Sequence, residues 1–139
     1  MSEGVLLGTC ALIWLGNEAP LKEEARDAIR EAARSHALLI SAVSVWELSL
    51  AVQRRKNPLR LLPDIRRWLM DLAGQPGMRR LPLDFEHALG AASLPEPFHQ
   101  DPADRLLVAQ AREMDLPIVT RDRRILDYGE RGNVRVMAC

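Results

Sequence analysis

Short apolar runs alternate with helical patterns along the whole chain, and this alternation limits the possible folds most. Runs at residues 4–7, 38–40, 78–83, 117–120 and 134–137 predict five short strands. Strands that are separated by helices favour a mostly parallel sheet with helices on both faces. We therefore predict an α/β protein with a three-layer α/β/α arrangement.

The helical patterns lie between these runs. The segment 20–34 is amphipathic, with Leu21, Ala25 and Ile29 on one face and charged residues on the other. The chain has 139 residues and shows no repeat or linker, so residues 1–139 are expected to form a single domain. The other predicted helices cover residues 9–15, 44–55, 64–73, 84–93, 101–114 and 123–126.

Large apolar side chains at helical spacing are expected in the core. In the helix 44–55 we expect Trp46, Leu50 and Ala51 to face inward, and Trp14 and Trp68 are also expected to be core residues. The three histidines show no metal-ligand spacing and are interpreted as surface or turn residues.

The apolar run 5–15 is too short to span a bilayer, which needs about 20 residues. No Lys or Arg precedes it, which argues against a signal peptide. The two cysteines form no CxxC pair. We therefore expect no membrane association and a cytoplasmic location.

The formal net charge is zero, so bulk charge does not predict nucleic-acid binding and only local basic patches could serve it. One such patch contains Arg121, Arg123 and Arg124. These side chains could hold phosphate groups, or they could form a solvated face with ion pairs to nearby acids.

Acidic residues follow the predicted strands or begin helices at one edge of the sheet, where ligands of parallel sheets bind. They are Glu47, Asp101, Asp104 and Asp122. Carboxylates that are forced together repel one another, and a hard divalent cation relieves that repulsion. The pattern is consistent with a Mg²⁺ or Mn²⁺ site that activates a water for hydrolysis.

Helix capping explains the same residues without a metal. Asp101 precedes Pro102 in the manner of an N-cap, and Asp122 could cap the helix that follows it. Ser44 and Glu47 have the spacing of a capping box. Spacing alone leaves both interpretations open.

Five segments, taken in order, resemble the PIN domain, and specifically the VapC-type toxins of bacterial toxin–antitoxin pairs. Together with the helices between them they cover almost the whole chain. They are LLGTCALIWL (6–15), SAVSVWELSLAVQRRK (41–56), QPGMRRLPL (75–83), DPADRLLVAQA (101–111) and LPIVTRDRRIL (116–126).

The resemblance implies cleavage of RNA that depends on Mg²⁺ or Mn²⁺, a homodimer, and a cognate VapB-like antitoxin that inserts a segment into the acidic groove. It also implies roles for individual residues. Glu47, Asp104 and Asp122 match the acids of the family, and Asp101 matches a further acid of one subgroup. Thr9, Thr120, Arg121 and Arg123 fall beside the implied site and are predicted to contact substrate.

Gly8 departs from the family pattern, which has an aspartate at this position after the first strand. Loss of a metal ligand predicts that the chain is catalytically crippled or inactive. We favour the hypothesis that an active parent carried Asp at this position. A natural inactive relative, or a rescue in which Asp101 holds the ion, is also open.

Two other enzyme classes fit the sequence less well. A phosphoacceptor receiver domain needs an acid pair after the first strand and a late lysine, whereas no lysine follows Lys56. A dinucleotide-binding oxidoreductase needs a GxGxxG after the first strand, which is absent. A non-catalytic module that binds antitoxin or RNA is the alternative that Gly8 favours.

Overall fold

The computed structural model of the chain describes residues 4–16, 20–54 and 64–139. Within these residues a five-stranded sheet has the order β3-β2-β1-β4-β5, and all neighbouring strands pair in parallel. The predicted parallel α/β sheet is therefore confirmed. The strands are β1 (Val5–Leu7), β2 (Leu38–Ser41), β3 (Met78–Leu81), β4 (Ile118–Thr120) and β5 (Val136–Ala138).

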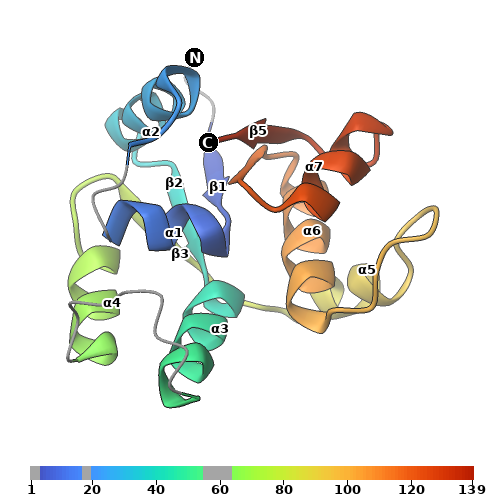
Figure 1. The fold of residues 1–139 in the computed structure, drawn as a ribbon, viewed down its shortest axis with the longest axis horizontal. Coiled ribbons are helices and arrows are strands. Elements are labelled where there is room, and N and C mark those ends of the chain that lie inside the picture. The colour runs from blue at the N-terminus through green and yellow to red at the C-terminus, as the bar shows by residue number, and fades with distance from the viewer. Residues whose placement is uncertain (1–3, 17–19, 55–63) are drawn as a thin grey trace.

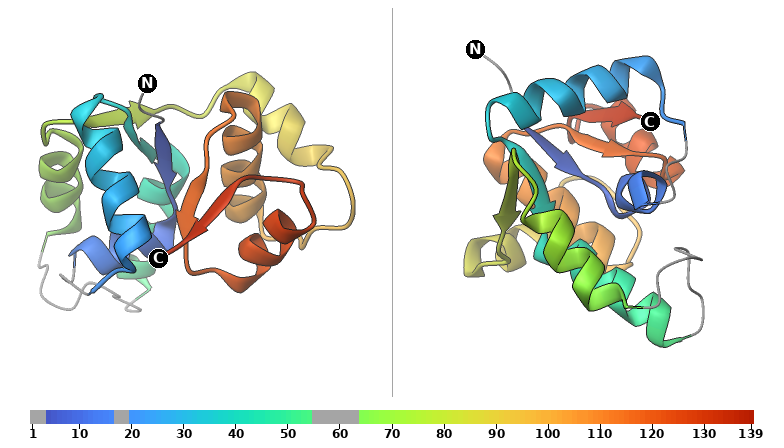
Figure 2. Two further views of the ribbon diagram at one scale, coloured as in Figure 1. Left: turned by 90° about the horizontal axis from the view of Figure 1, so that it is seen from above. Right: turned by 90° about the vertical axis from the view of Figure 1, so that its left-hand side faces the viewer.

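Helices cover both faces of the sheet and make three layers. Figures 1 and 2 show α2 and α4 on one side and α6 on the other, with α5 packed against α6. No helix in the described part of the chain is long and apolar enough to cross a membrane. The helices are α1 (Thr9–Gly16), α2 (Glu23–Arg34), α3 (Ala42–Gln53), α4 (Ile65–Ala73), α5 (Phe85–Ala92), α6 (Pro102–Met114) and α7 (Arg123–Glu130).

Alternate residues of the strands supply two cores, because successive side chains of a strand point to opposite faces. Leu7 and Val119 belong to the core beneath α1, α2 and α4. Leu6 and Ile118 belong to the core beneath α6 and α7. The short strands are apolar on both faces because both faces are covered.

The third helix differs from its prediction. It begins at Ala42 rather than Ser44, and its N-cap is Ser41, whose hydroxyl accepts a hydrogen bond from Val43 N. Trp46 was expected in the core but is 55% exposed, and Leu48 is buried instead. This helix is apolar around most of its circumference, so periodicity could not select its buried face. Its predicted last residue, Arg55, lies outside the described residues.

Other boundaries differ by a few residues. The predicted strand 78–83 ends at Leu81, and the predicted strand 134–137 is observed at Val136–Ala138. The helix predicted for 123–126 continues to Glu130. Trp14 and Trp68 are partly buried.

Gly77, which precedes β3, packs against α2 with a positive φ of 90°. A Cβ atom there would lie 2.5 Å from the backbone oxygen of Ala33, so Gly77→Ala should destabilise the protein by about 3 kcal/mol or more. Gly132 is the matched control, because its φ is 84° and nothing lies within 4 Å of its Cβ position. Gly132→Ala should cost only about 1–2 kcal/mol. Urea denaturation of both variants measures the difference, and equal losses would contradict the packing argument.

Candidate functional site

The parallel arrangement brings the carboxyl ends of β1, β2 and β4 to one edge of the sheet. Gly8 and Thr9 follow β1, Ser41 ends β2, and Thr120 ends β4. Helices α1, α3 and α7 begin within three residues of these ends, so polar groups of their first turns gather at this edge.

Three carboxylates meet beside this edge. Glu47 projects from α3, Asp101 precedes α6, and Asp104 lies in the first turn of α6. One ligand atom from each lies within 4.8 Å of the other two. The structure therefore brings together three of the four acids that the sequence singled out.

The protonation of Asp104 reflects this crowding. Burial raises its pKa to about 7, and the negative charges of Asp122, Asp101 and Glu47 contribute, in that order, while Arg124 partly offsets them. Burial also raises the pKa of Glu47, and the charges of Asp101 and Asp122 add to this effect. Asp122, the fourth acid, thus acts on the site through its charge although it lies outside the group of three.

Hydroxyl groups orient two of the acids. Thr9 Oγ1 donates a hydrogen bond of 2.6 Å to Glu47 Oε1 and is also hydrogen bonded to Ser44 Oγ at 3.0 Å. Thr120 Oγ1 accepts a hydrogen bond from Asp122 N at 3.0 Å. Thr9 and Thr120 therefore hold acidic residues in place. Their predicted contact with substrate stays a prediction.

The capping interpretation holds for two of the acids and fails for a third. Asp101 Oδ1 accepts from Ala103 N and Asp104 N at the start of α6. Asp122 Oδ1 accepts in the same way from the first turn of α7. The capping-box interpretation of Ser44 and Glu47 is excluded, because these residues lie inside α3 and their side chains face Thr9.

Gly8 lies where β1 closely approaches β4. Gly8 N donates a hydrogen bond of 2.8 Å to Val119 O. A Cβ atom on Gly8 would lie 2.8 Å from that same oxygen and 3.2 Å from Thr120 Cβ. A side chain here requires one of these strands to move. This contact is a backbone reason for a glycine at position 8.

The arginines predicted to contact substrate have protein partners. The guanidinium of Arg121 lies 3.6 Å from the ring centroid of Trp14 and donates a hydrogen bond to Pro20 O. Arg123 forms ion pairs with Asp127 and Glu130. The ion pairs of Arg123 are those expected of a solvated face, whereas half-buried Arg121 packs on an aromatic ring. Binding of phosphate by either residue stays a prediction.

Arg105 follows Asp104 in the chain but hydrogen bonds to backbone carbonyl groups rather than to that carboxylate. Its Nε donates to Ala91 O, and its NH1 donates to the carbonyl oxygens of Phe98 and His99. Arg105 therefore fixes the loop that precedes α6.

That loop carries His99, which was expected to be an ordinary surface or turn residue. His99 Nε2 lies 3.0 Å from Asp104 Oδ2. Its Nδ1 accepts from Asp101 N at 3.4 Å and lies 3.1 Å from Arg124 NH1. Burial, followed by the charge of Arg124, lowers the pKa of His99. No spacing rule predicts this contact, because a loop places the ring.

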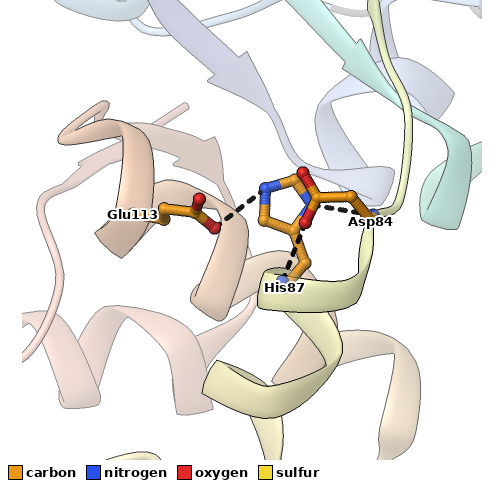
Figure 3. Close-up of side chains that lie close together, drawn as sticks. All are labelled: Asp84, His87 and Glu113. Atoms are coloured by element: carbon orange, nitrogen blue, oxygen red, sulfur yellow. Dashed lines mark hydrogen bonds and ion pairs between the residues drawn. The ribbon is translucent and has the colours of Figure 1, made fainter.

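A second group of possible ligands contains Asp84, His87 and Glu113 (Figure 3). His87 was expected at the surface, but it is only 3% exposed and forms a capping box with Asp84. Its Nδ1 accepts from Asp84 N and lies 3.2 Å from Asp84 Oδ1, whereas its Nε2 lies 3.1 Å from Glu113 Oε2. The two carboxylates flank opposite ring nitrogens, so one ion cannot readily contact all three groups.

The group of Glu47, Asp101 and Asp104 suits a hard cation better, because all of its donors are oxygen atoms. Opposite ligands of an octahedral Mg²⁺ lie about 4.2 Å apart. One oxygen from each of the three acids lies within 4.8 Å of the other two, a spacing close to that of the ligands around one such ion.

Comparison with known proteins gives consistent matches. A PIN domain profile matches residues 5–131. Ribonuclease VapC22 of Mycobacterium tuberculosis is 36% identical over 126 residues, which cover 89% of this chain and 91% of that protein.

Two solved structures share the fold. VapBC2 from Rickettsia felis, bound to a DNA fragment from its promoter, matches with a TM-score of 0.69 and 14% identity, over 96% of this chain and 97% of the other. DNA-bound VapBC from Salmonella typhimurium matches with a TM-score of 0.67 and 17% identity, over 98% of each chain.

Asp104 should make stability depend on pH. The unfolded carboxyl loses its proton near pH 3.8, whereas the folded one keeps it to about pH 7. The folded state binds more protons between these values, so stability should fall as pH rises through them. Asp104→Asn removes this penalty, and its stability relative to the parent should improve by about 1–2 kcal/mol between pH 5 and pH 8.

Urea denaturation in the presence of a chelator tests this expectation. Asp71→Asn, at an exposed position on α4, is the control and should show no such trend. A constant difference between Asp104→Asn and the parent at the two pH values would count against a strained carboxylate.

Proposed function

The chain belongs to the PIN domain family, and from this premise we propose that it is the toxin of a VapBC-like toxin–antitoxin pair. Its site is suited to the hydrolysis of RNA phosphodiester bonds with a divalent cation. We propose that residues 1–139 form one PIN domain. The observation that carries the proposal is the convergence of Glu47, Asp101 and Asp104 at the carboxyl edge of the sheet. The name and 36% identity of Ribonuclease VapC22 support the same activity.

Mg²⁺ or Mn²⁺ would be held by Glu47, Asp101 and Asp104, with Asp122 near enough to add negative charge. When bound, such an ion lowers the pKa of a water and stabilises charge on a phosphodiester. The residues of the chain prepare the site. Thr9 orients Glu47, and Asp104 places its partly buried carboxylate beside it.

Gly8 makes this site weaker than one with a fourth carboxylate from β1. We propose that the chain binds its ion poorly and is crippled or inactive as a nuclease. Loss of even an indirect ligand contact weakens metal sites by about 10–100-fold. The second candidate function is a non-catalytic PIN module that binds antitoxin or RNA. The close approach of Gly8 to Val119 favours it, because the backbone at this edge leaves no room for a side chain at position 8 without a shift.

Gly8→Asp distinguishes the two functions. The new carboxylate should tighten Mn²⁺ binding by about 10–100-fold and should allow cleavage of RNA. The clash with Val119 O should lower stability by about 1–3 kcal/mol. Gly8→Ala is the matched control, since it adds the same Cβ without a ligand.

Calorimetry with Mn²⁺ and an RNA cleavage assay measure both effects. Gly8→Ala should show the stability loss alone. Intact RNA in the presence of a well-folded, Mn²⁺-binding Gly8→Asp variant would remove the nuclease proposal and leave the binding module.

An apolar groove is the proposed docking place for a VapB-like antitoxin. It has a volume of about 760 Å³ and lies between α3, α4 and the end of β3. Val45, Leu69 and Met70 line it, and Arg66 and Arg80 stand among them. An amphipathic segment with an apolar face and acidic neighbours would complement this surface. The homodimer and the cytoplasmic location also remain part of the proposal.

Met70→Asp tests the groove. Met70 is 53% exposed, so the substitution should leave the fold intact while it places a charge in the apolar interface. Binding to the cognate VapB-like antitoxin should weaken by about 30-fold or more, equivalent to about 2 kcal/mol.

Met114→Asp is the control, because Met114 is 41% exposed at the end of α6 and does not line the groove. Titration of the purified antitoxin against each variant gives the affinities. Equal weakening by both substitutions would exclude the groove as the specific docking place.

A further inference from the structure

A chain of buried hydrogen bonds joins the two helices that carry the acidic group. Ser41 Oγ donates a hydrogen bond of 2.5 Å to Gln110 Oε1, and both residues have no exposed surface. Ser41 is the N-cap of α3, and Gln110 lies on α6. Neither residue belongs to the carboxylate group.

The amide of Gln110 has a single orientation. Its oxygen faces the hydroxyl of Ser41, and its Nε2 donates to Pro82 O at 3.3 Å. Nε2 also lies 3.4 Å from His87 Nδ1. The ring of His87 is itself fixed between Asp84 and Glu113, as Figure 3 shows. Hydrogen bonds therefore fix both ends of the Gln110 amide. If the amide were flipped, its NH₂ group would face the hydroxyl donor of Ser41, and its oxygen would face the carbonyl oxygen of Pro82.

The position of this link allows it to set the distance between the acidic side chains of α3 and α6. Glu47 lies six residues after Ser41, and Asp104 lies six residues before Gln110. Six helical residues span about 9 Å, so the acidic group lies about 9 Å from the link along both helices, which run in opposite directions. Any sliding or rotation of α6 against α3 would therefore change the separation of Glu47 and Asp104.

We propose that Gln110 is a positioning residue, which through Ser41 and His87 sets the spacing of the carboxylates that hold the cation. This inference rests on the proposed function, because the carboxylates are proposed to hold a metal. The effect of Gln110 on the spacing of the carboxylates can be tested without a metal. The hydrogen bonds of Gln110 are with Ser41, Pro82 and His87 and not with the acidic group, so it acts through the placement of α6 against α3.

The test uses Gln110→Met, which keeps the length of the side chain and removes its hydrogen bonds. Val108→Ala is the control, because it removes buried volume from α6 and leaves the link intact. In metal-free crystal structures, the carboxylate oxygens of Glu47, Asp101 and Asp104 should lie farther apart than in the unaltered chain only in Gln110→Met. Calorimetric titration with Mn²⁺ should show an affinity reduced about tenfold in Gln110→Met and unchanged in Val108→Ala.

Ser41→Ala and the double variant complete the test. Because both substitutions break the same bond, the double variant should bind Mn²⁺ about as weakly as the weaker single variant. Three results would each overturn the inference. They are a double variant whose loss of Mn²⁺ affinity is the product of the two single losses, an equal loss of Mn²⁺ affinity in Val108→Ala, and an unchanged carboxylate spacing in Gln110→Met. If the unaltered chain binds no Mn²⁺, the three acids alone do not hold the ion, while the metal-free structures still decide the role of Gln110.

Discussion

The packing of α3 against α6 places Glu47 beside Asp101 and Asp104, and the site depends on this forced proximity of like charges. Two unit charges about 4 Å apart repel by about 4 kcal/mol at the effective dielectric of a protein surface. The folded chain lowers this cost by keeping Asp104 protonated up to about pH 7. A bound cation is the other way to lower it. The repulsion among these carboxylates, which destabilises the ion-free protein, therefore favours the binding of a metal ion.

Capping and ligation are not true alternatives for Asp101 and Asp122. Each uses its Oδ1 atom to accept hydrogen bonds from the first turn of the following helix. A carboxylate has a second oxygen and further lone pairs, so a capping acid can still face an ion. The cap fixes the rotamer and thereby prepares the other oxygen. Residue spacing could not separate the two roles because one side chain serves both.

The sequence predicted the parallel sheet and the edge at which the acids gather, because both follow from the alternation of strands and helices. It did not predict which face of α3 is buried, since Trp46 and Leu48 lie in an apolar stretch without clear periodicity. It also missed His87, His99 and the partners of Arg105. Their contacts bridge segments far apart in the chain, and only tertiary packing defines them.

Gly8 changes more than the number of ligands. An aspartate here would add a carboxylate, but its Cβ would press on Val119 O from 2.8 Å. The hydrogen bond from Gly8 N to that oxygen holds the two strands together at this point. A gain in metal affinity therefore has to exceed the cost of parting β1 from β4. Since that cost falls on the strand ends that carry Thr9 and Thr120, backbone movement and ligand geometry at this edge are coupled.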